Sequence, residues 1–364
     1  MGTRFTLRSV PAAICLLPFA LACGGDGDTA SDTGSLSTAP TILVDLDPDS
    51  TGMTFTIENI TADADGLLYT SDRESGDVLR VDPEDPSPVV VGRLASRVDA
   101  AGMTQKANGA GLAVTAGGDL LIASGAFNEV LRLSSAALAA EPPAEAETFA
   151  TGVMGANALL LERQRLFVSG GATGNVYLVP ASGGAAQVWA RIEQTTRSVP
   201  PDNFMQSVVA NGLARARTGE LLVADTARAA VWSIPENPDG SAGAPEMMVQ
   251  DAALDGVDGL AFDPNGRLWA AVNERNALVV IEGGQVREVF KNDNTGPLEF
   301  PAALVFVGDV GYVANFDRAR ADNFAPDGTS SSAGIGSSIA RFEAGAGRPA
   351  RAGSGTTVTD SPVY

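Results

Sequence analysis

The chain has 364 residues, a formal net charge of −20 and no histidine, and 45% of its residues are hydrophobic. This composition excludes a disordered acidic tail, because enough apolar side chains exist to bury a core, and the negative charge argues against nucleic acid as a partner. The lack of histidine excludes Ser-His-Asp triads, Cys-His pairs and His-ligated zinc. Any chemistry must come from carboxylates, amides, lysines, hydroxyls or a hard metal ion.

The N-terminal segment indicates export. Arg4 and Arg8 precede an apolar run that is too short to span a membrane and has the length of a signal-peptide core. The run ends at Cys23 in a context that resembles the bacterial lipobox, whose cysteine is lipidated. The alternative is plain secretion with an incidental cysteine. Cys15 and Cys23 are the only cysteines, and we expect no disulfide.

The residues after Cys23 form a Gly-, Asp-, Ser- and Thr-rich stretch without an apolar pattern. We therefore expect a lipoprotein signal peptide over residues 1–22 and a flexible tether over 23–40. The domain would be exported and lipid-anchored to a bacterial membrane, on the periplasmic or cell-surface side, with no other membrane contact. We expect it to be a monomer.

From about residue 41, short runs rich in Val, Leu, Ile and Ala alternate with Gly, Asp, Asn or Pro, which is typical of an all-β protein. One phrase recurs six times: a short first strand, a turn, a strong apolar strand, a third strand and an outer strand. The fifth copy is the clearest and runs from Val257 to Val272. Equivalent positions, numbers 58, 110, 157, 211, 258 and 302, are 44 to 54 residues apart, which suits four-stranded propeller blades.

We therefore predict a six-bladed β-propeller over residues 41–345 and a flexible C-terminal tail over 346–364. The sixth copy has no outer strand of its own, whereas the run Thr41 to Asp47 stands without a partner before the first copy. The simplest closure uses this N-terminal strand to complete the last blade, which leaves no free sheet edge at the seam.

In a propeller, the starts of the innermost strands share one face around the central axis. One position in each copy is then expected to face a common funnel, and these six residues are Glu58, Ala110, Asn157, Asn211, Asp258 and Ala302. Four of them carry oxygen donors and none carries nitrogen or sulfur ligands that zinc prefers. Such a ring suits a divalent cation such as Ca²⁺, Mg²⁺ or Mn²⁺, with Zn²⁺ atypical.

The six-fold pattern, with an acid in copy one, Asn in copies three and four and Asp in copy five, resembles the gluconolactonase, regucalcin (senescence marker protein) and luciferin-regenerating-enzyme family. Its strongest pieces are Ala210 to Leu213 and Val257 to Ala261. The usual Glu-Gly-Pro of the first blade is replaced by Glu58-Asn59-Ile60. The resemblance implies a divalent metal, Ca²⁺ first, held by Glu58, Asn157, Asn211 and Asp258, and hydrolysis of sugar lactones or related esters.

In the implied mechanism, the metal polarises the carbonyl and a carboxylate deprotonates a water. Asp258 would be a ligand and the catalytic base, Glu58 the anionic ligand, and the two asparagines neutral ligands. Further candidates for indirect or substrate contacts lie near the same face; they are Asn108, Asp225, Asn273, Asn315 and Arg318. Two insertions, 193–206 and about 318–336, are candidate specificity elements, although the second is rich in Gly, Ser and Ala and is equally compatible with disorder.

Each candidate also has a structural interpretation. Asn211-Gly212 and Asp258-Gly259 are turn-forming pairs, and Asp225 and Asn315 suit ordinary strand ends. Glu58 has no turn role and would be costly to bury without a cation. The main functional alternative is a non-catalytic propeller that binds a ligand or protein and uses any metal for structure. The sequence resembles strictosidine-synthase-like or paraoxonase-like propellers more weakly. The lack of histidine argues against the histidine-assisted chemistry of the paraoxonase type.

Overall fold

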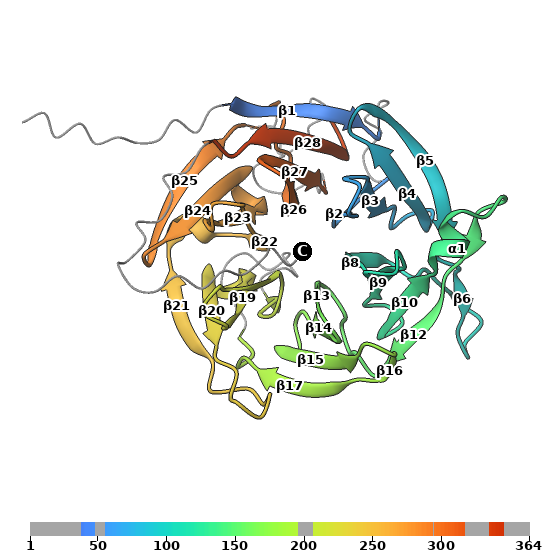
Figure 1. The fold of residues 1–364 in the computed structure, drawn as a ribbon, viewed down its shortest axis with the longest axis horizontal. Helices are drawn as coiled ribbons and strands as arrows, with labels where there is room; N and C mark the ends of the chain where they lie inside the picture. Colours follow the sequence, from blue (N-terminus) through green and yellow to red (C-terminus); the bar gives the residue numbers. More distant parts are fainter. Residues whose placement is uncertain (1–37, 48–54, 196–206, 294, 317–334, 346–364) are drawn as a thin grey trace, which may run out of the picture. The chain divides into compact units, whose positions relative to one another are not determined.

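The computed structural model describes residues 38–47, 55–195, 207–293, 295–316 and 335–345. These residues form six antiparallel sheets arranged as blades around a central axis (Figure 1). The chain is therefore a six-bladed β-propeller, as predicted. Residues 1–37, most of both predicted insertions and the predicted C-terminal tail lie outside the described residues, and so do Cys23 and Arg318.

Each of the first three blades runs from its innermost to its outermost strand in chain order. Blade 1 contains β2 (Thr61–Ala62), β3 (Leu68–Ser71), β4 (Asp77–Asp82) and β5 (Asp85–Arg93). Blade 2 contains β8 (Gly109–Val114), β9 (Leu120–Ser124), β10 (Glu129–Leu133) and β12 (Glu147–Thr151). Blade 3 contains β13 (Leu159–Glu162), β14 (Arg165–Ser169), β15 (Asn175–Pro180) and β17 (Gln187–Arg191).

Blades 4 and 5 repeat this order, whereas blade 6 borrows its outer strand. Blade 4 contains β18 (Leu213–Arg215), β19 (Leu221–Asp225), β20 (Ala230–Ile234) and β21 (Glu246–Gln250). Blade 5 contains β22 (Val257–Phe262), β23 (Leu268–Val272), β24 (Ala277–Glu282) and β25 (Gln285–Lys291). Blade 6 contains β26 (Pro301–Val307), β27 (Val310–Asn315), β28 (Ser338–Glu343) and β1 (Thr38–Asp45).

The strand β1 confirms the predicted closure of the ring. It pairs antiparallel with β28, so that Thr41 lies opposite Arg341 and Asp45 opposite Ser338. The strand begins three residues earlier than the predicted start at Thr41. Because the two ends of the propeller meet in one sheet, opening the ring requires breaking this ladder.

Short elements fill the connections. The two-residue strands β11 (Ala144–Glu145) and β16 (Gly184–Ala185) extend the outer edges of blades 1 and 2 in parallel, and β6 (Arg97–Val98) pairs with β7 (Thr104–Gln105). The helical turns are α1 (Ser135–Leu138), η2 (Thr226–Arg228), η3 (Ala252–Leu254) and η4 (Asn273–Arg275). No helix among the described residues has the length and apolar character needed to cross a membrane.

Most of the core consists of six hydrophobic clusters, one between each pair of neighbouring blades, and a small seventh cluster contains Phe300, Ala302 and Phe316. The strand β19 shows why its sequence is apolar throughout. Leu221 and Val223 pack toward blade 3, whereas Leu222 and Ala224 pack toward blade 5. Successive side chains of a strand point to opposite faces, so a middle strand between two neighbours must be apolar on both. This explains how more than 250 described residues form one ring without one large core.

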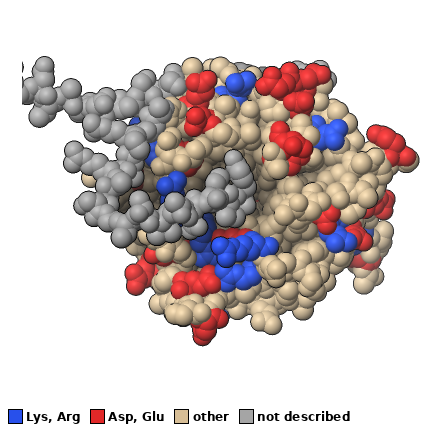
Figure 2. All heavy atoms as spheres, viewed as in Figure 1, with Lys and Arg blue, Asp and Glu red and all other residues tan. Residues whose placement is uncertain are grey.

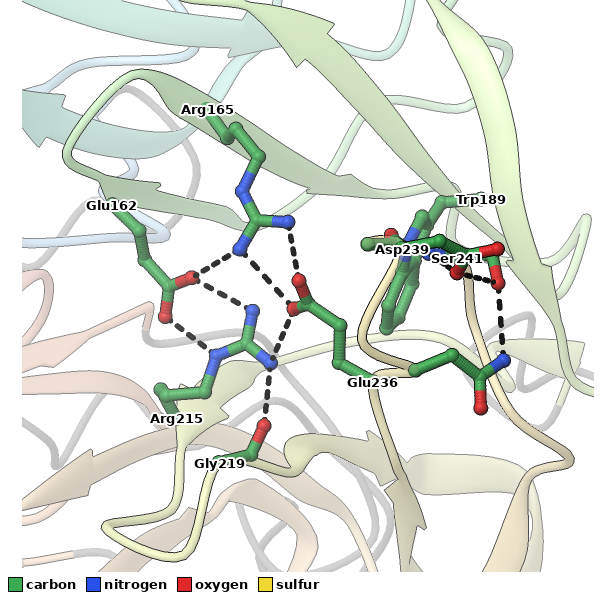
Figure 3. Close-up of polar contacts among 10 residues, drawn as sticks. Glu162, Arg165, Trp189, Arg215, Gly219, Glu236, Asp239 and Ser241 are labelled. Carbon is green, nitrogen blue, oxygen red and sulfur yellow. Dashed lines mark hydrogen bonds and ion pairs between the residues drawn. The ribbon is translucent and has the colours of Figure 1, made fainter.

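A polar network ties blades 3 and 4 together at the ends of the inner strands opposite the predicted site (Figure 3). Arg215 donates to both carboxylate oxygens of Glu162, at 2.6 and 2.7 Å, and Arg165 donates to both of Glu236, at 2.6 and 3.1 Å. The centre of the Phe167 ring lies 4.9 Å from the Arg215 guanidinium carbon and 5.1 Å from that of Arg165. Two arginines and two glutamates thus neutralise one another in a half-buried position.

Charged side chains of both signs are spread over the molecular face drawn in Figure 2, with acidic groups around the ring and basic groups interspersed among them. Below the centre of the view, basic groups lie together, with acidic groups beside them.

Candidate functional site

The structure places the six predicted positions at or just before the starts of the inner strands. Glu58, Ala110, Asp258 and Ala302 each directly follow the first inner-strand residue that pairs with the second strand of the blade; the pairs are Ile57 with Asp72, Gly109 with Ser124, Val257 with Val272 and Pro301 with Asn315. Asn157 and Asn211 instead precede the first such pairs of their blades, Leu159 with Val168 and Leu213 with Val223. The inner strands lie nearest to the axis in Figure 1. We call the four polar residues, Glu58, Asn157, Asn211 and Asp258, the axial cluster.

Three members of the axial cluster, from blades 3, 4 and 5, lie close to one another. The Nδ2 atom of Asn157 donates to Oδ1 of Asn211 over 2.9 Å. The side chain of Asn211 lies near Asp258 and lowers the pKa of its carboxyl group, and Nδ2 of Asn273 donates to Oδ2 of Asp258 over 3.1 Å. Residues that are 101 positions apart in sequence, 157 and 258, therefore belong to one cluster.

Glu58, the remaining member, forms an ion pair with Arg73 of the same blade. The side chains of Glu58 and Arg73 are 14% and 22% exposed, so the pair is largely shielded from water. The positive charge of Arg73 also acts on Asp258. A buried Glu58 was expected to need a positively charged partner. The guanidinium of Arg73 is such a partner, and it was not predicted from the sequence.

In blades 1, 4 and 5, the residue that contacts the axial cluster stands at the same position of the repeat. Arg73, Thr226 and Asn273 each stand 15 residues after the axial-cluster residue of their own blade, namely Glu58, Asn211 and Asp258. Asn211 donates through Nδ2 to Oγ1 of Thr226 over 2.9 Å. Thr226 in turn donates to the carbonyl oxygen of Val257 over 2.6 Å.

The recurrence of this spacing in blades 1, 4 and 5 is the sequence signal that would have revealed Arg73 and Thr226. Both follow directly after the predicted second strands, where only Asn273 was recognised.

Burial dominates the electrostatics of Asp258, whose residue is 5% exposed. Removal from water raises the pKa of its carboxyl group to about 7. The hydrogen bond from Asn273, the charge of Arg73 and the hydrogen bond with Asn211 act in the opposite direction and keep the pKa from rising further. A carboxyl group with this pKa can accept or release a proton near neutral pH.

The glycines next to the axial cluster have a packing role. A Cβ atom on Gly212 would lie 2.1 Å from the carbonyl oxygen of Asp258, and one on Gly259 would lie 2.6 Å from the Cα atom of Ala303. Gly259 lies inside β22, and neither glycine has a positive φ. The interpretation of Asn211-Gly212 and Asp258-Gly259 as turns is therefore wrong: glycine is required because neighbouring inner strands approach closely around the axis.

Asp225 and Asn315 are fully buried at strand ends and are committed to hydrogen bonds. Asp225 accepts from the backbone and the guanidinium of Arg228 and from Nε1 of Trp232, and burial raises the pKa of its carboxyl group. Asn315 donates through Nδ2 to the Pro297 carbonyl and to Ser338, and its Oδ1 accepts from the backbone of residue 299. These contacts give both side chains a role in holding their own blades.

The other predicted contact residues differ in position. Asn273 touches Asp258 directly, and its Oδ1 atom is buried without a hydrogen-bond partner among the described residues. Asn108 precedes β8 in a left-handed conformation, with φ of 49°. The described part of the chain records no side-chain hydrogen bond for Asn108, so nothing there ties it to the axial cluster.

The donor set of the axial cluster fits a hard divalent cation. It offers two carboxylates and two amide groups, whose oxygens are the ligands that such a cation prefers. No three Asp, Glu or Cys side chains within the described ranges gather closely enough to hold a metal by themselves. A cation bound here would therefore depend on the amide oxygens as well as on Glu58 and Asp258.

Comparison with known proteins adds information on the fold. No known family matches the sequence, and no curated protein matches it. Solved structures do match. A calcium-binding regucalcin from Agrobacterium tumefaciens has a TM-score of 0.59 at 16% identity, covering 84% of this chain and 93% of that one. A luciferin-regenerating enzyme has a TM-score of 0.58 at 14% identity, covering 81% and 93%.

A gluconolactonase from Xanthomonas campestris has a TM-score of 0.57 at 16% identity, covering 84% of this chain and 88% of that one. All three similarities extend over more than four fifths of both chains, at identities that establish the fold alone. The resemblance expected from the sequence is therefore confirmed at the level of the fold: the chain is a six-bladed β-propeller similar in structure to regucalcin, luciferin-regenerating enzyme and gluconolactonase.

Proposed function

We propose that the chain is a hydrolase that opens a lactone or a related ester at the axial cluster and binds a divalent cation there. The observation that carries the proposal is the convergence of two carboxylates and two amides from four different blades on one end of the axis. Structural similarity to a gluconolactonase supports the reaction class, although a propeller fold alone does not select a reaction.

Asp258 is assigned two roles, as a ligand and as the base that accepts a proton from the attacking water. The hydrogen bond from Asn273 orients its carboxylate, and the ionised form is the one that can both bind a cation and accept a proton. Glu58, Asn157 and Asn211 would complete the oxygen ligands of Ca²⁺, or of Mg²⁺ or Mn²⁺. When bound, the cation would polarise the substrate carbonyl and stabilise negative charge on its oxygen.

The test measures hydrolysis by the purified full chain. Sugar lactones, acyl lactones and aryl esters are offered with Ca²⁺, Mg²⁺, Mn²⁺ or Zn²⁺ and, separately, with a chelator. We expect metal-dependent turnover that falls by at least about a hundredfold in Asp258→Asn and Glu58→Gln. Glu246→Gln, which changes an exposed carboxylate on β21, serves as the control and should retain full turnover. Turnover unchanged in Asp258→Asn would overturn the assignment.

One alternative is favoured by a specific observation. Glu58 already has a cationic partner in Arg73, as would be expected in a propeller that uses the cluster only to hold its blades. In that case the chain binds a ligand or a protein without catalysis, and any metal has a structural role. Metal would then raise the melting temperature without producing turnover on any substrate of the panel.

We also propose that the chain is exported and anchored through lipidated Cys23, as a monomer outside the cytoplasm. The support is the sequence around Cys23 and the composition of the following stretch. Mass spectrometry of the chain expressed in a bacterium should find a lipidated Cys23 at its N-terminus after loss of residues 1–22. Replacing Cys23 with serine should release the protein from the membrane fraction, and unchanged membrane association would contradict the anchor.

A further inference from the structure

Arg73 is the feature that distinguishes blade 1 from the other polar blades. At the position that contacts the axial cluster, blades 4 and 5 place the neutral side chains of Thr226 and Asn273. Blade 1 places a guanidinium there, paired with Glu58. In blade 6, Phe316 follows Asn315, the partner of Pro301, and the Arg73 guanidinium carbon lies 5.4 Å from the centre of the Phe316 ring.

The charges around Arg73 define its effect. Glu58 and Asp258 contribute two negative charges when both are ionised, and Arg73 contributes one positive charge that acts on both. Arginine stays protonated at any pH at which the protein is folded, so this charge is permanent. A divalent cation that binds Glu58 and Asp258 must therefore either displace the guanidinium or tolerate its repulsion.

We propose that Arg73 is a positioning residue that holds Glu58 in the metal-free protein and competes with the divalent cation for it. This inference rests on the metal site of the proposed function and deepens it. In the metal-free protein, the Arg73 guanidinium neutralises the largely buried Glu58 carboxylate, which would otherwise be an unpaired charge. Arg73 also lowers the affinity of the site for the metal, because the ion pair between Glu58 and Arg73 must break before the cation can bind Glu58. After the cation displaces it from Glu58, the Arg73 guanidinium can keep its cation–π contact with the Phe316 ring.

The experiment measures binding of Ca²⁺, with Mg²⁺ and Mn²⁺ in parallel, by calorimetry on the purified full chain. Arg73→Gln removes the charge, Arg73→Met is a second neutral variant in case the first does not fold, and Arg73→Lys preserves the charge as a matched control. We expect both neutral variants to bind Ca²⁺ roughly tenfold or more tightly than the wild type, and Arg73→Lys to bind no more tightly.

Thermal melting provides a second readout that does not depend on turnover. Without metal, Arg73→Gln should melt below the wild type, because Glu58 loses its partner, and saturating Ca²⁺ should raise the melting temperature of the variant more than that of the wild type.

Two further outcomes separate this inference from the proposed function. If the wild type binds Ca²⁺ and the neutral variants, folded, bind it equally or less tightly, the competition is overturned while the metal site stands. If neither the wild type nor any variant binds a divalent cation, both the metal site and the competition are overturned.

Discussion

Asp258 offers a quantitative test of the axial cluster, because its buried carboxyl group links stability to pH. Its pKa rises from 3.8 to about 7 in the folded chain, mainly through loss of water. The pKa of Asp258 is higher in the folded than in the unfolded chain, so protonation of Asp258 stabilises the fold. This contribution to the free energy of unfolding is fully present below about pH 4. It is lost as the pH rises to about 7. The shift of about three pKa units corresponds to about 4 kcal/mol in the free energy of unfolding.

Asp258→Asn removes the ionisation and retains an oxygen that can accept from Asn273. We expect the wild type without metal to lose stability relative to the variant between about pH 4 and pH 7, by an amount on the order of 10 °C in Tm. Melting temperatures of both proteins, measured in chelator across this range, give the difference directly. Asp225 also has a raised pKa, but it is present in both proteins and cancels in the comparison. Parallel pH profiles for the wild type and the variant would refute the electrostatic reasoning.

The remaining predictions concern the ring. Gly212→Ala would bring a Cβ against the Asp258 carbonyl and should lower the free energy of unfolding by about 1–3 kcal/mol. Gly117→Ala is the control, because it lies in an exposed turn where the nearest atom beyond its two chain neighbours would be 3.8 Å from the Cβ, and it should change this free energy by less than about 0.5 kcal/mol. Denaturant unfolding of both variants measures the difference. Arg215→Ala should cost about 1–3 kcal/mol by leaving Glu162 without its bidentate partner, and an equal loss in exposed Arg287→Ala would contradict this. Deleting residues 38–45 should lower Tm and produce aggregation through the freed edge of β28, measured by light scattering, and an unchanged monomer would show that β1 does not close the ring.

The fold was accessible from the sequence because its periodicity is explicit. The second strand of each copy is apolar on both faces, since it packs between two neighbours, and this makes β19 and β23 easy to recognise. The missing outer strand of copy six predicted the pairing of β1 with β28 correctly. The register of the repeats also placed Glu58, Asn157, Asn211 and Asp258 at one end of the inner strands. There the structure joins Asn157 to Asn211 by a hydrogen bond, brings Asn211 near Asp258, and pairs Glu58 with Arg73.

The contacts within the site were less accessible. Glycine after Asn211 or Asp258 suggests a turn locally, and only the approach of the neighbouring inner strand shows that it is required for packing. Asp225 and Asn315 share a strand-end position with residues near the site, yet their own partners commit them elsewhere. Arg73 was missed because an arginine after a strand is common on surfaces, and its inward contact with Glu58 depends on the three-dimensional arrangement of blade 1.

The most direct test of the proposed site combines metal binding with turnover in the same preparations of full chain. Calorimetry and elemental analysis measure cation binding, and the lactone and ester panel measures hydrolysis, for the wild type, Glu58→Gln, Asp258→Asn and the exposed control Glu246→Gln. The proposal predicts one bound divalent cation in the wild type and the control, loss of binding in both cluster variants, and loss of hydrolysis in parallel. A folded wild type that binds no cation would contradict it, as would hydrolysis that persists when both cluster variants have lost the metal.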